Sequence, residues 1–198
     1  MNILTDTLPV SVEIGGKKVP INTDFRAGIK FESLILSGEE SVFAILSPFF
    51  ERIIPDDLDG AFRAAEWFYC CGKIPDKKEK PTEGKNKQAY SFDMDSDVIF
   101  SDFWNFYNID LSQEGLHWWA FRSLLFGLPE DSEFKQRIYY RTCSLKDLSK
   151  KERQRVLKIR AQIEIKTKEG EKTTLDERNA KMKAYILKRQ KELAKGGE

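Results

Sequence analysis

The feature that most constrains this chain is where its aromatic residues lie. The sequence holds fourteen Phe, six Tyr and four Trp, and most of them precede residue 141. A chain this rich in large apolar rings is not typical of a disordered protein, because the rings stabilise a fold when they are buried together. We therefore expect a folded body in this part of the chain. A length of 198 residues is enough to bury a sizeable core.

The charge distribution divides the chain near Ser149. Residues 149–198 contain sixteen Lys and Arg against eight Asp and Glu, a net charge of +8, and the preceding residues carry −7. Charged residues make up 33% of the chain, which is above the globular norm, so part of the chain should lie outside a packed core. We predict a helical body over 1–148 and a basic helical arm over 149–198.

The first half of the body is predicted to start with a β-hairpin. Val10, Val12 and Ile14 alternate with polar residues, and the pair Gly15-Gly16 is typical of a two-residue turn. Asn22 or Thr23 is the expected cap of the first helix. Three helices are predicted here, over about 24–36, 39–52 and 55–72. Residues 73–88 have no large apolar residue after Ile74, and they predict a mobile loop.

The second half is predicted to be helical throughout. A helix over about 93–107 has an unusually wide aromatic surface, and a second one should start at Asp110 or Ser112 and end before Gly127. A third is expected from about 129 to 141. The arm has two capping boxes, Ser149 with Glu152 and Thr174 with Glu177, which predict two helices. The predicted fold is mainly α: a helical bundle with a short N-terminal β-hairpin and a C-terminal helical arm.

Three acidic residues at the start of the 93–107 helix resemble the opening of a calcium loop. Asp93, Asp95 and Asp97 alternate as such ligands do, but the sixth position is Val98 where the loop needs Gly. The twelfth position is Trp104 where the loop needs Glu. We therefore interpret the three carboxylates as favourable charges at a helix N-terminus.

The remaining reactive side chains predict no chemistry. His117 is the only histidine, so it is expected to pack, and the three cysteines contain no C-x-x-C pair. No glycine-rich phosphate loop is present. We predict that the protein is not an enzyme and has no catalytic residues, no metal site and no cofactor.

The cysteines and the apolar stretches indicate where in the cell the protein is expected. An odd number of cysteines argues against a disulfide framework and favours a reducing cytoplasm. Asp6 and Glu13 interrupt the only N-terminal stretch that could be a signal, and no apolar run approaches the roughly 20 residues that span a bilayer. We expect a soluble protein in the cytoplasm with no membrane contact.

The aromatic helices supply the candidate binding residues. A partner helix could bury an apolar stripe against them, as in helix-in-groove recognition. The alternative, which we favour, is that these rings form the core. The candidates for partner binding are Phe103, Trp104, Tyr107, Trp118, Trp119 and Arg122.

Several motifs resemble a known family of bacteriophage proteins, the gene-product-fifteen family of siphophages that infect Gram-positive bacteria. The resemblance covers most of residues 3–160. The early motifs are Leu4-Thr5-Asp6 with Leu8-Pro9, Pro20-Ile21-Asn22-Thr23-Asp24-Phe25-Arg26 and Tyr90-Ser91-Phe92-Asp93. The most specific block comprises Ile109-Asp110-Leu111, Leu116-His117-Trp118-Trp119-Ala120-Phe121-Arg122, Gly127-Leu128-Pro129-Glu130-Asp131 and Tyr140-Arg141.

The resemblance implies a role in building a long non-contractile tail. The family's genes resemble those that lie between the tail tube gene and the tape-measure gene, where tail assembly chaperones are encoded. Such a chaperone would bind the apolar, helical tape-measure protein in the host cytoplasm and help recruit the tail tube protein, and it could act as a homo-oligomer.

Two other functions stay open at this level. One is a structural tail or connector component that remains in the virion. The other is a nucleic-acid-binding regulator, which rests only on the charge of the arm. The acidic residues interspersed in that arm make nucleic acid the less favoured partner.

Overall fold

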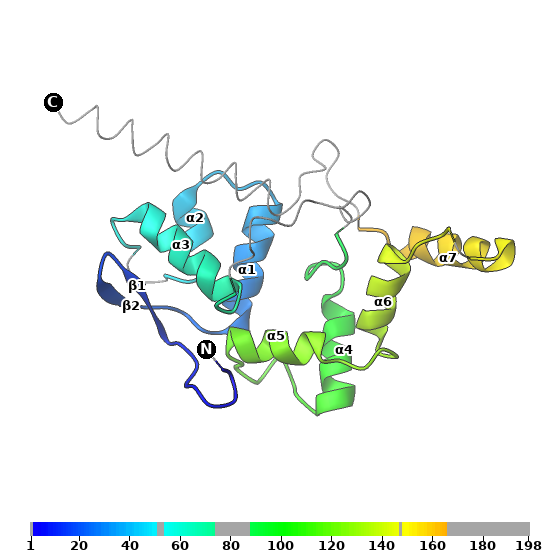
Figure 1. The fold of residues 1–198 in the computed structure, drawn as a ribbon, viewed down its shortest axis with the longest axis horizontal. Helices are drawn as coiled ribbons and strands as arrows, with labels where there is room; N and C mark the ends of the chain where they lie inside the picture. Colours follow the sequence, from blue (N-terminus) through cyan, green and yellow to red (C-terminus); the bar gives the residue numbers. More distant parts are fainter. Residues whose placement is uncertain (1, 51–53, 74–87, 147, 166–198) are drawn as a thin grey trace. The chain divides into compact units, whose positions relative to one another are not determined.

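The computed structural model describes residues 2–50, 54–73, 88–146 and 148–165, and this part of the chain is mainly helical (Figure 1). It contains a two-stranded hairpin and seven helices. The elements are β1 (Ser11–Ile14), β2 (Lys17–Pro20), α1 (Phe25–Leu36), α2 (Val42–Leu46), α3 (Leu58–Tyr69), α4 (Ser96–Tyr107), α5 (Trp118–Phe126), α6 (Glu133–Thr142) and α7 (Lys150–Ile163). The predicted mainly α class, with an N-terminal hairpin and a helix at the start of the arm, is confirmed.

The described residues form two compact units. The first is built from the residues up to Lys73 and from Gly115–Arg122. The second is built from those between residue 88 and Glu114 and between Ser123 and Ile165. The division falls within α5.

The hairpin forms as predicted. Val12 pairs with Val19 and Ile14 with Lys17, in antiparallel register. The two residues between the strands, Gly15 and Gly16, have φ of 56° and 75°, a left-handed conformation that glycine adopts without strain. The side chains of Val12 and Ile14 are buried.

The first helix is capped by neither of the two predicted residues, Asn22 and Thr23. Asp24 is the N-cap of α1, because its carboxylate accepts a hydrogen bond from the Arg26 backbone N–H at 2.8 Å. The Asn22 side chain instead accepts from the Asp24 N–H at 3.0 Å. The side chain predicted as the cap therefore fixes the residue that caps the helix.

The predicted helix over 39–52 is wrong in length. Helix α2 starts after the N-cap Ser41 and ends at Leu46, directly before Ser47 and Pro48. Pro48 has no backbone N–H to continue a helix, and its ring crowds the preceding turn. Residues 51–53 of the predicted helix lie outside the described residues.

Helix α3 completes the first unit, whose core is aromatic. Its N-cap is Asp57, whose carboxylate accepts from the Gly60 N–H at 2.9 Å, so the helix begins after the predicted Pro55. Phe31 on α1 lies at the centre of the core, with ring centroids 5.0 Å from Phe49 and 5.4 Å from Tyr69.

The helix predicted from Asp110 or Ser112 starts later than expected. The Asp110 carboxylate accepts from the Ser112 N–H at 2.8 Å, which closes a turn instead of capping a helix. His117 then forms an isolated β-bridge with Asp24. Because residues in such a bridge are extended, α5 begins only at Trp118.

In the second unit α4 and α6 pack together, and α7 packs on α6. Helix α4 begins at Ser96, three residues after the predicted start, and α6 follows the N-cap Ser132. The buried apolar residues of this unit are Phe92, Val98, Ile99, Phe103, Leu111, Leu125, Leu128, Phe134 and Val156.

The arm begins as its first capping box predicts. The Glu152 N–H donates to the Ser149 hydroxyl at 3.4 Å, and the Ser149 N–H donates to the Glu152 carboxylate at 3.1 Å. The Arg160 guanidinium on α7 donates to the backbone oxygens of Tyr140 and Cys143, which attaches the helix to the end of α6. The second capping box and residues 74–87 of the predicted mobile loop lie outside the described residues.

Candidate partner-binding surface

Exposed aromatic side chains of the second unit lie along α4. Phe100 and Trp104 are one helical turn apart, and their side chains are 38% and 50% exposed. Tyr107 follows at the next turn and is half-buried. We call Phe100, Trp104 and Tyr107 the α4 aromatic stripe, since the spacing i, i+4, i+7 puts them on one face of the helix.

A hydrogen bond holds the ring of Tyr107, the last residue of the stripe. The Tyr107 hydroxyl donates to the backbone oxygen of Leu124 at 2.8 Å, and burial raises the pKa of this phenol. After Tyr107 the helix stops at Asn108, whose φ of 55° is left-handed. The last ring of the stripe is therefore held in place while the middle one, Trp104, faces solvent.

Phe103 and Asp102 anchor α4 in the second unit. Phe103 is fully buried, and its ring packs edge-on against Tyr107 with centroids 5.5 Å apart. The buried carboxylate of Asp102 accepts a hydrogen bond from the Phe134 N–H at 2.8 Å, at the start of α6. These contacts present the stripe on a supported helix, which suits a binding surface.

A buried ion cluster holds the N-terminal end of α4. Asp95 lies directly before this helix, and its carboxylate accepts from Arg141 at 2.6 and 2.9 Å and from Arg137 at 3.0 Å. It also accepts from the Ser91 N–H at 3.0 Å. Burial alone would raise the pKa of Asp95, but these hydrogen bonds and positive charges keep it below its ordinary value.

The ion cluster is the feature that sequence reasoning missed. The interpretation of Asp93, Asp95 and Asp97 as acids near a helix N-terminus accounts for Asp97, which lies in the first turn of α4. It did not foresee that Asp95 would be fully buried against two arginines more than forty residues away. Asp93, Ser96 and Asp97 surround Asp95 in the sequence, so no local signal distinguished the buried carboxylate from the exposed ones.

The candidates on α5 lie in the first unit and are mostly core residues. The side chains of Trp118 and Trp119 are buried, and their indole N–H groups donate to the backbone oxygens of Tyr69 and Phe68 at 2.9 and 2.7 Å. Arg122, which is half-buried, donates to the same Tyr69 oxygen at 2.9 Å.

These three donors serve the C-terminal end of α3. The last carbonyl groups of a helix lack partners within the helix and carry partial negative charge. Trp118, Trp119 and Arg122 supply those partners, so their polar groups are engaged within the unit. Of the six predicted candidates, Trp104 presents the most exposed side chain, and partner binding by the set stays a prediction.

His117 is likewise engaged inside the first unit. Its Nε2 lies 3.0 Å from the Pro9 backbone oxygen, and its Nδ1 accepts from the Trp119 N–H at 3.1 Å. Burial lowers the pKa of this imidazole, which favours the neutral ring. Nδ1 is thus the acceptor and Nε2 carries the proton.

Among the residues that the structure describes, His, Cys, Asp and Glu side chains form no group of three that could hold a metal ion. No helix in this part of the chain is long and apolar enough to cross a membrane.

Comparison with known proteins places the chain in a family. The family described as Bacteriophage Gp15 protein matches residues 4–165, and the chain belongs to it. No curated protein and no solved structure matches the chain significantly.

Proposed function

We propose that this bacteriophage protein is a tail assembly chaperone that binds the tape-measure protein and assists assembly of the tail tube. The observation that carries the proposal is the α4 aromatic stripe, because a supported helix with exposed rings suits the capture of an apolar helical segment. Membership of the bacteriophage family supports it. In this proposal the protein acts in the host cytoplasm, without catalysis.

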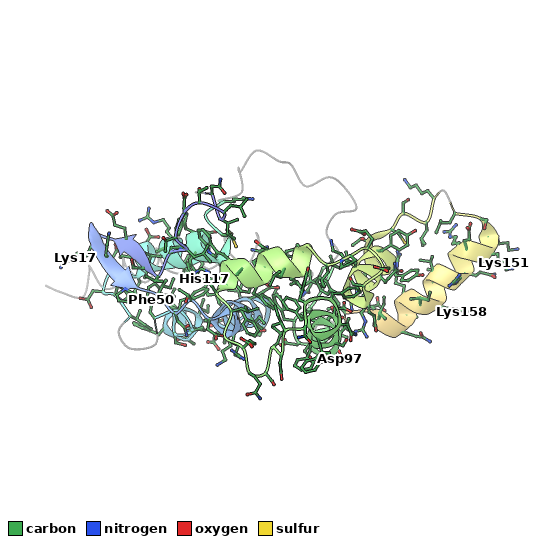
Figure 2. All side chains as sticks on the ribbon, turned by 90° about the horizontal axis from the view of Figure 1, so that it is seen from below. Lys17, Phe50, Asp97, His117, Lys151 and Lys158 are labelled. Atoms are coloured by element: carbon green, nitrogen blue, oxygen red, sulfur yellow. The ribbon has the colours of Figure 1, made fainter. Side chains whose placement is uncertain are left out.

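The charges beside the stripe indicate how a partner helix would be oriented. Asp97 lies one turn before Phe100 and two turns before Trp104 and is exposed, and Figure 2 shows it on α4. A carboxylate at one end of an apolar stripe favours a partner segment with a basic residue at the matching end.

Co-expression with the tape-measure protein of the same genome tests the proposal. The wild-type chain is expected to keep the tape-measure protein soluble, and the double variant Phe100→Ala/Trp104→Ala is expected to lose this effect. The matched control is Phe43→Ala/Tyr139→Ala, which removes two other exposed rings, 58% and 52% exposed, outside the stripe. If the stripe variant and the control behave alike, the stripe is not the binding surface.

A structural tail or connector component is the second candidate, and family membership fits it equally. Mass spectrometry of purified virions separates the two functions. A chaperone leaves the finished particle, so abundant copies in mature virions would defeat the proposed function.

A nucleic-acid-binding function has one structural observation in its favour. Helix α7 exposes five basic residues, among them Lys151 and Lys158, which Figure 2 shows along the helix. The full set is Lys150, Lys151, Arg153, Arg155 and Lys158. This function predicts DNA or RNA binding that weakens steeply as salt rises, because phosphate contacts release counterions.

A further inference from the structure

The pairing register of the hairpin shows which backbone groups point outward on each of its two edges. In an antiparallel pair, alternate residues bond to the partner strand and the residues between them point their backbone groups outward. The two-residue turn makes Ile14 and Lys17 a bonded pair, and the same alternation recurs where the Ile21 N–H donates to the Val10 oxygen at 3.1 Å. The backbone groups of Ser11 and Glu13 therefore point away from β2.

The outer edge of β2 is blocked. Its outward positions are Lys18 and Pro20, which pair with Glu13 and Ser11. Proline has no N–H to donate, and a lysine on an edge discourages a further strand. The edge of β1 has no proline, and its one charged outward residue is Glu13.

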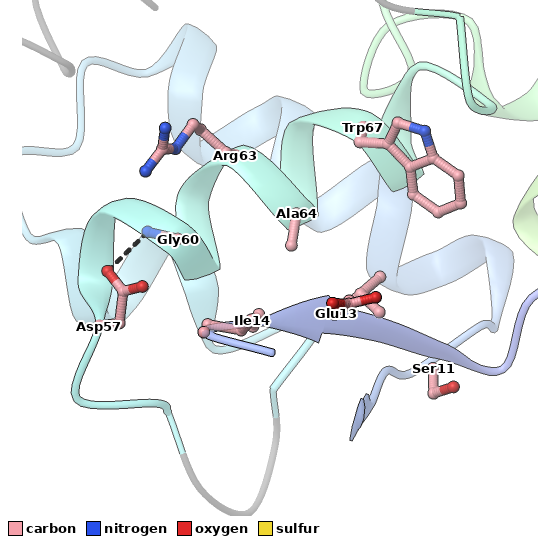
Figure 3. Close-up of a pocket in the computed structure, with 10 residues that line it drawn as sticks. Ser11, Glu13, Ile14, Asp57, Gly60, Arg63, Ala64 and Trp67 are labelled. Carbon is pink, nitrogen blue, oxygen red and sulfur yellow. Dashed lines mark hydrogen bonds between the residues drawn. The ribbon is translucent and has the colours of Figure 1, made fainter. Parts of the chain in front are cut away.

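The outer edge of β1 borders a groove in the first unit. The groove has a volume of about 580 Å³ and runs between the backbone of β1 and one face of α3 (Figure 3). Its lining includes Ser11, Glu13, Gly60, Arg63, Ala64 and Trp67. This volume falls within the range of about 300 to 1,000 Å³ that is usual for ligand sites.

Small residues of α3 create the space beside β1. Gly60 and Ala64 are one turn apart on the face that lines the groove, and Trp67 lies one turn further along. A Cβ at Gly60 would meet the side chains of Asp57 and Ile14, so a larger residue there requires one of them to shift. The groove is thus open along β1 and has an aromatic ring at one end.

Two carboxylates line the groove, those of Asp57 and Glu13. Arg63 pairs with Asp59 at 2.5 Å, and Asp57 accepts from the Gly60 N–H. Glu13 is exposed and forms no ion pair with the residues that the structure describes. A ligand in the groove would meet this negative charge at the edge of the strand.

From these observations we propose that the β1 edge binds an extended peptide segment of a partner protein as an added antiparallel strand. The backbone groups of Ser11 and Glu13 form its main-chain hydrogen bonds, and α3 forms the side wall of its site. This mode of binding takes affinity from the backbone and specificity from alternate side chains. The site is separate from the α4 aromatic stripe and does not depend on the proposed chaperone function.

The register defines the chemistry of the segment. A residue opposite Val12 points to the buried side, where Ala64 and Trp67 favour an apolar side chain of moderate size. The next residue, opposite Glu13, lies on the exposed side and should be Lys or Arg, since opposite charges directly across a strand pair are favourable. The segment therefore alternates apolar and basic residues.

Amide hydrogen exchange of the full chain tests the proposal, with the capped peptide Thr-Val-Lys-Val-Lys-Thr as the probe. In the free protein the amides of Ser11 and Glu13 should exchange faster than those of Val12 and Ile14, which bond to β2. Millimolar peptide should slow exchange at Ser11 and Glu13 by about tenfold or more, because each then donates a backbone hydrogen bond. Exchange at Lys18, on the other edge, should not change.

Two matched changes show whether binding uses the backbone and Glu13. The same peptide with N-methyl groups on both lysines, which lie opposite Ser11 and Glu13 and would otherwise donate to β1, should bind about tenfold more weakly. Glu13→Lys should reverse the preference, so that a peptide with Glu in place of Lys binds better than the probe.

Three results would overturn the proposal. They are unchanged exchange at Ser11 and Glu13 with millimolar probe, equal binding of the N-methylated peptide, and exchange at both amides that becomes slower as the protein concentration rises. The last would mean that a second copy of the chain occupies the edge. None of these measurements involves the tape-measure protein, so they leave the proposed function untouched.

Discussion

The carboxylate of Asp95 lies 2.6 and 2.9 Å from the two terminal nitrogens of Arg141, and both side chains are buried. Arg141 also donates to the backbone oxygens of Ala89 and Ile163, at 3.2 and 2.8 Å. One guanidinium therefore joins the segment before α4, helix α6 and the end of α7. The second unit depends on an ion pair as well as on its apolar core.

Arg141→Met should destabilise the second unit strongly. The change leaves the Asp95 carboxylate buried with Arg137 as its one remaining cation, and breaking a buried pair costs about 3 to 5 kcal/mol. Urea unfolding followed by tryptophan fluorescence measures the loss. The control is Arg155→Met on the exposed side of α7, which should change the free energy of unfolding by less than about 0.5 kcal/mol. Equal stabilities of the two variants would contradict the structural role of Arg141.

Acid should weaken the protein through Asp95. The folded-state pKa of this carboxyl is lowered, so its contribution is present above the unfolded pKa of about 3.9 and is lost as pH falls through the folded value. The unfolding midpoint in urea should therefore drop below about pH 4. Asp95→Asn should be less stable at neutral pH and should show a shallower drop, whereas Asp97→Asn, at an exposed position, should follow the wild type.

Trp119→Ala and Trp104→Ala should separate core from surface. Trp119 is buried and its indole N–H bonds to Phe68, so its truncation should cost about 3 to 5 kcal/mol. Trp104 is half exposed, and its truncation should cost less than about 1 kcal/mol. Thermal melts of both variants give the comparison. A wild-type melt for Trp119→Ala would mean that its ring is exposed and available as a binding anchor.

Gly28→Ala should destabilise the first unit. A Cβ at this position of α1 would lie 2.4 Å from the Trp118 ring, and the ring is buried and cannot move without repacking. Overpacking of this kind costs about 1 to 3 kcal/mol. The matched change is Gly115→Ala, where the nearest atom is 3.6 Å from the added Cβ and no penalty is expected. Chemical unfolding of the two variants side by side measures the difference, and an unaffected Gly28→Ala would show that Trp118 packs elsewhere.

Local signals in the sequence determined where several elements begin. Gly15 and Gly16 form the predicted turn, and the capping box of Ser149 and Glu152 starts α7. These features depend on backbone preferences and hydrogen bonds within a few residues, so neighbouring residues contain the information. The same kind of signal was present at Pro48, which ends α2 and shows why the longer predicted helix does not form.

Only the tertiary structure decided which side chains face solvent and which polar groups meet. Periodicity indicated a wide aromatic surface on α4, but the packing of the second unit buries Phe103 and leaves Trp104 exposed. The start of α5 depends on a bridge between His117 and Asp24, and Asp95 meets Arg141 across 46 positions. Burial and charge pairing depend on contacts between residues far apart in the chain. A local sequence pattern does not tell which distant residues will meet.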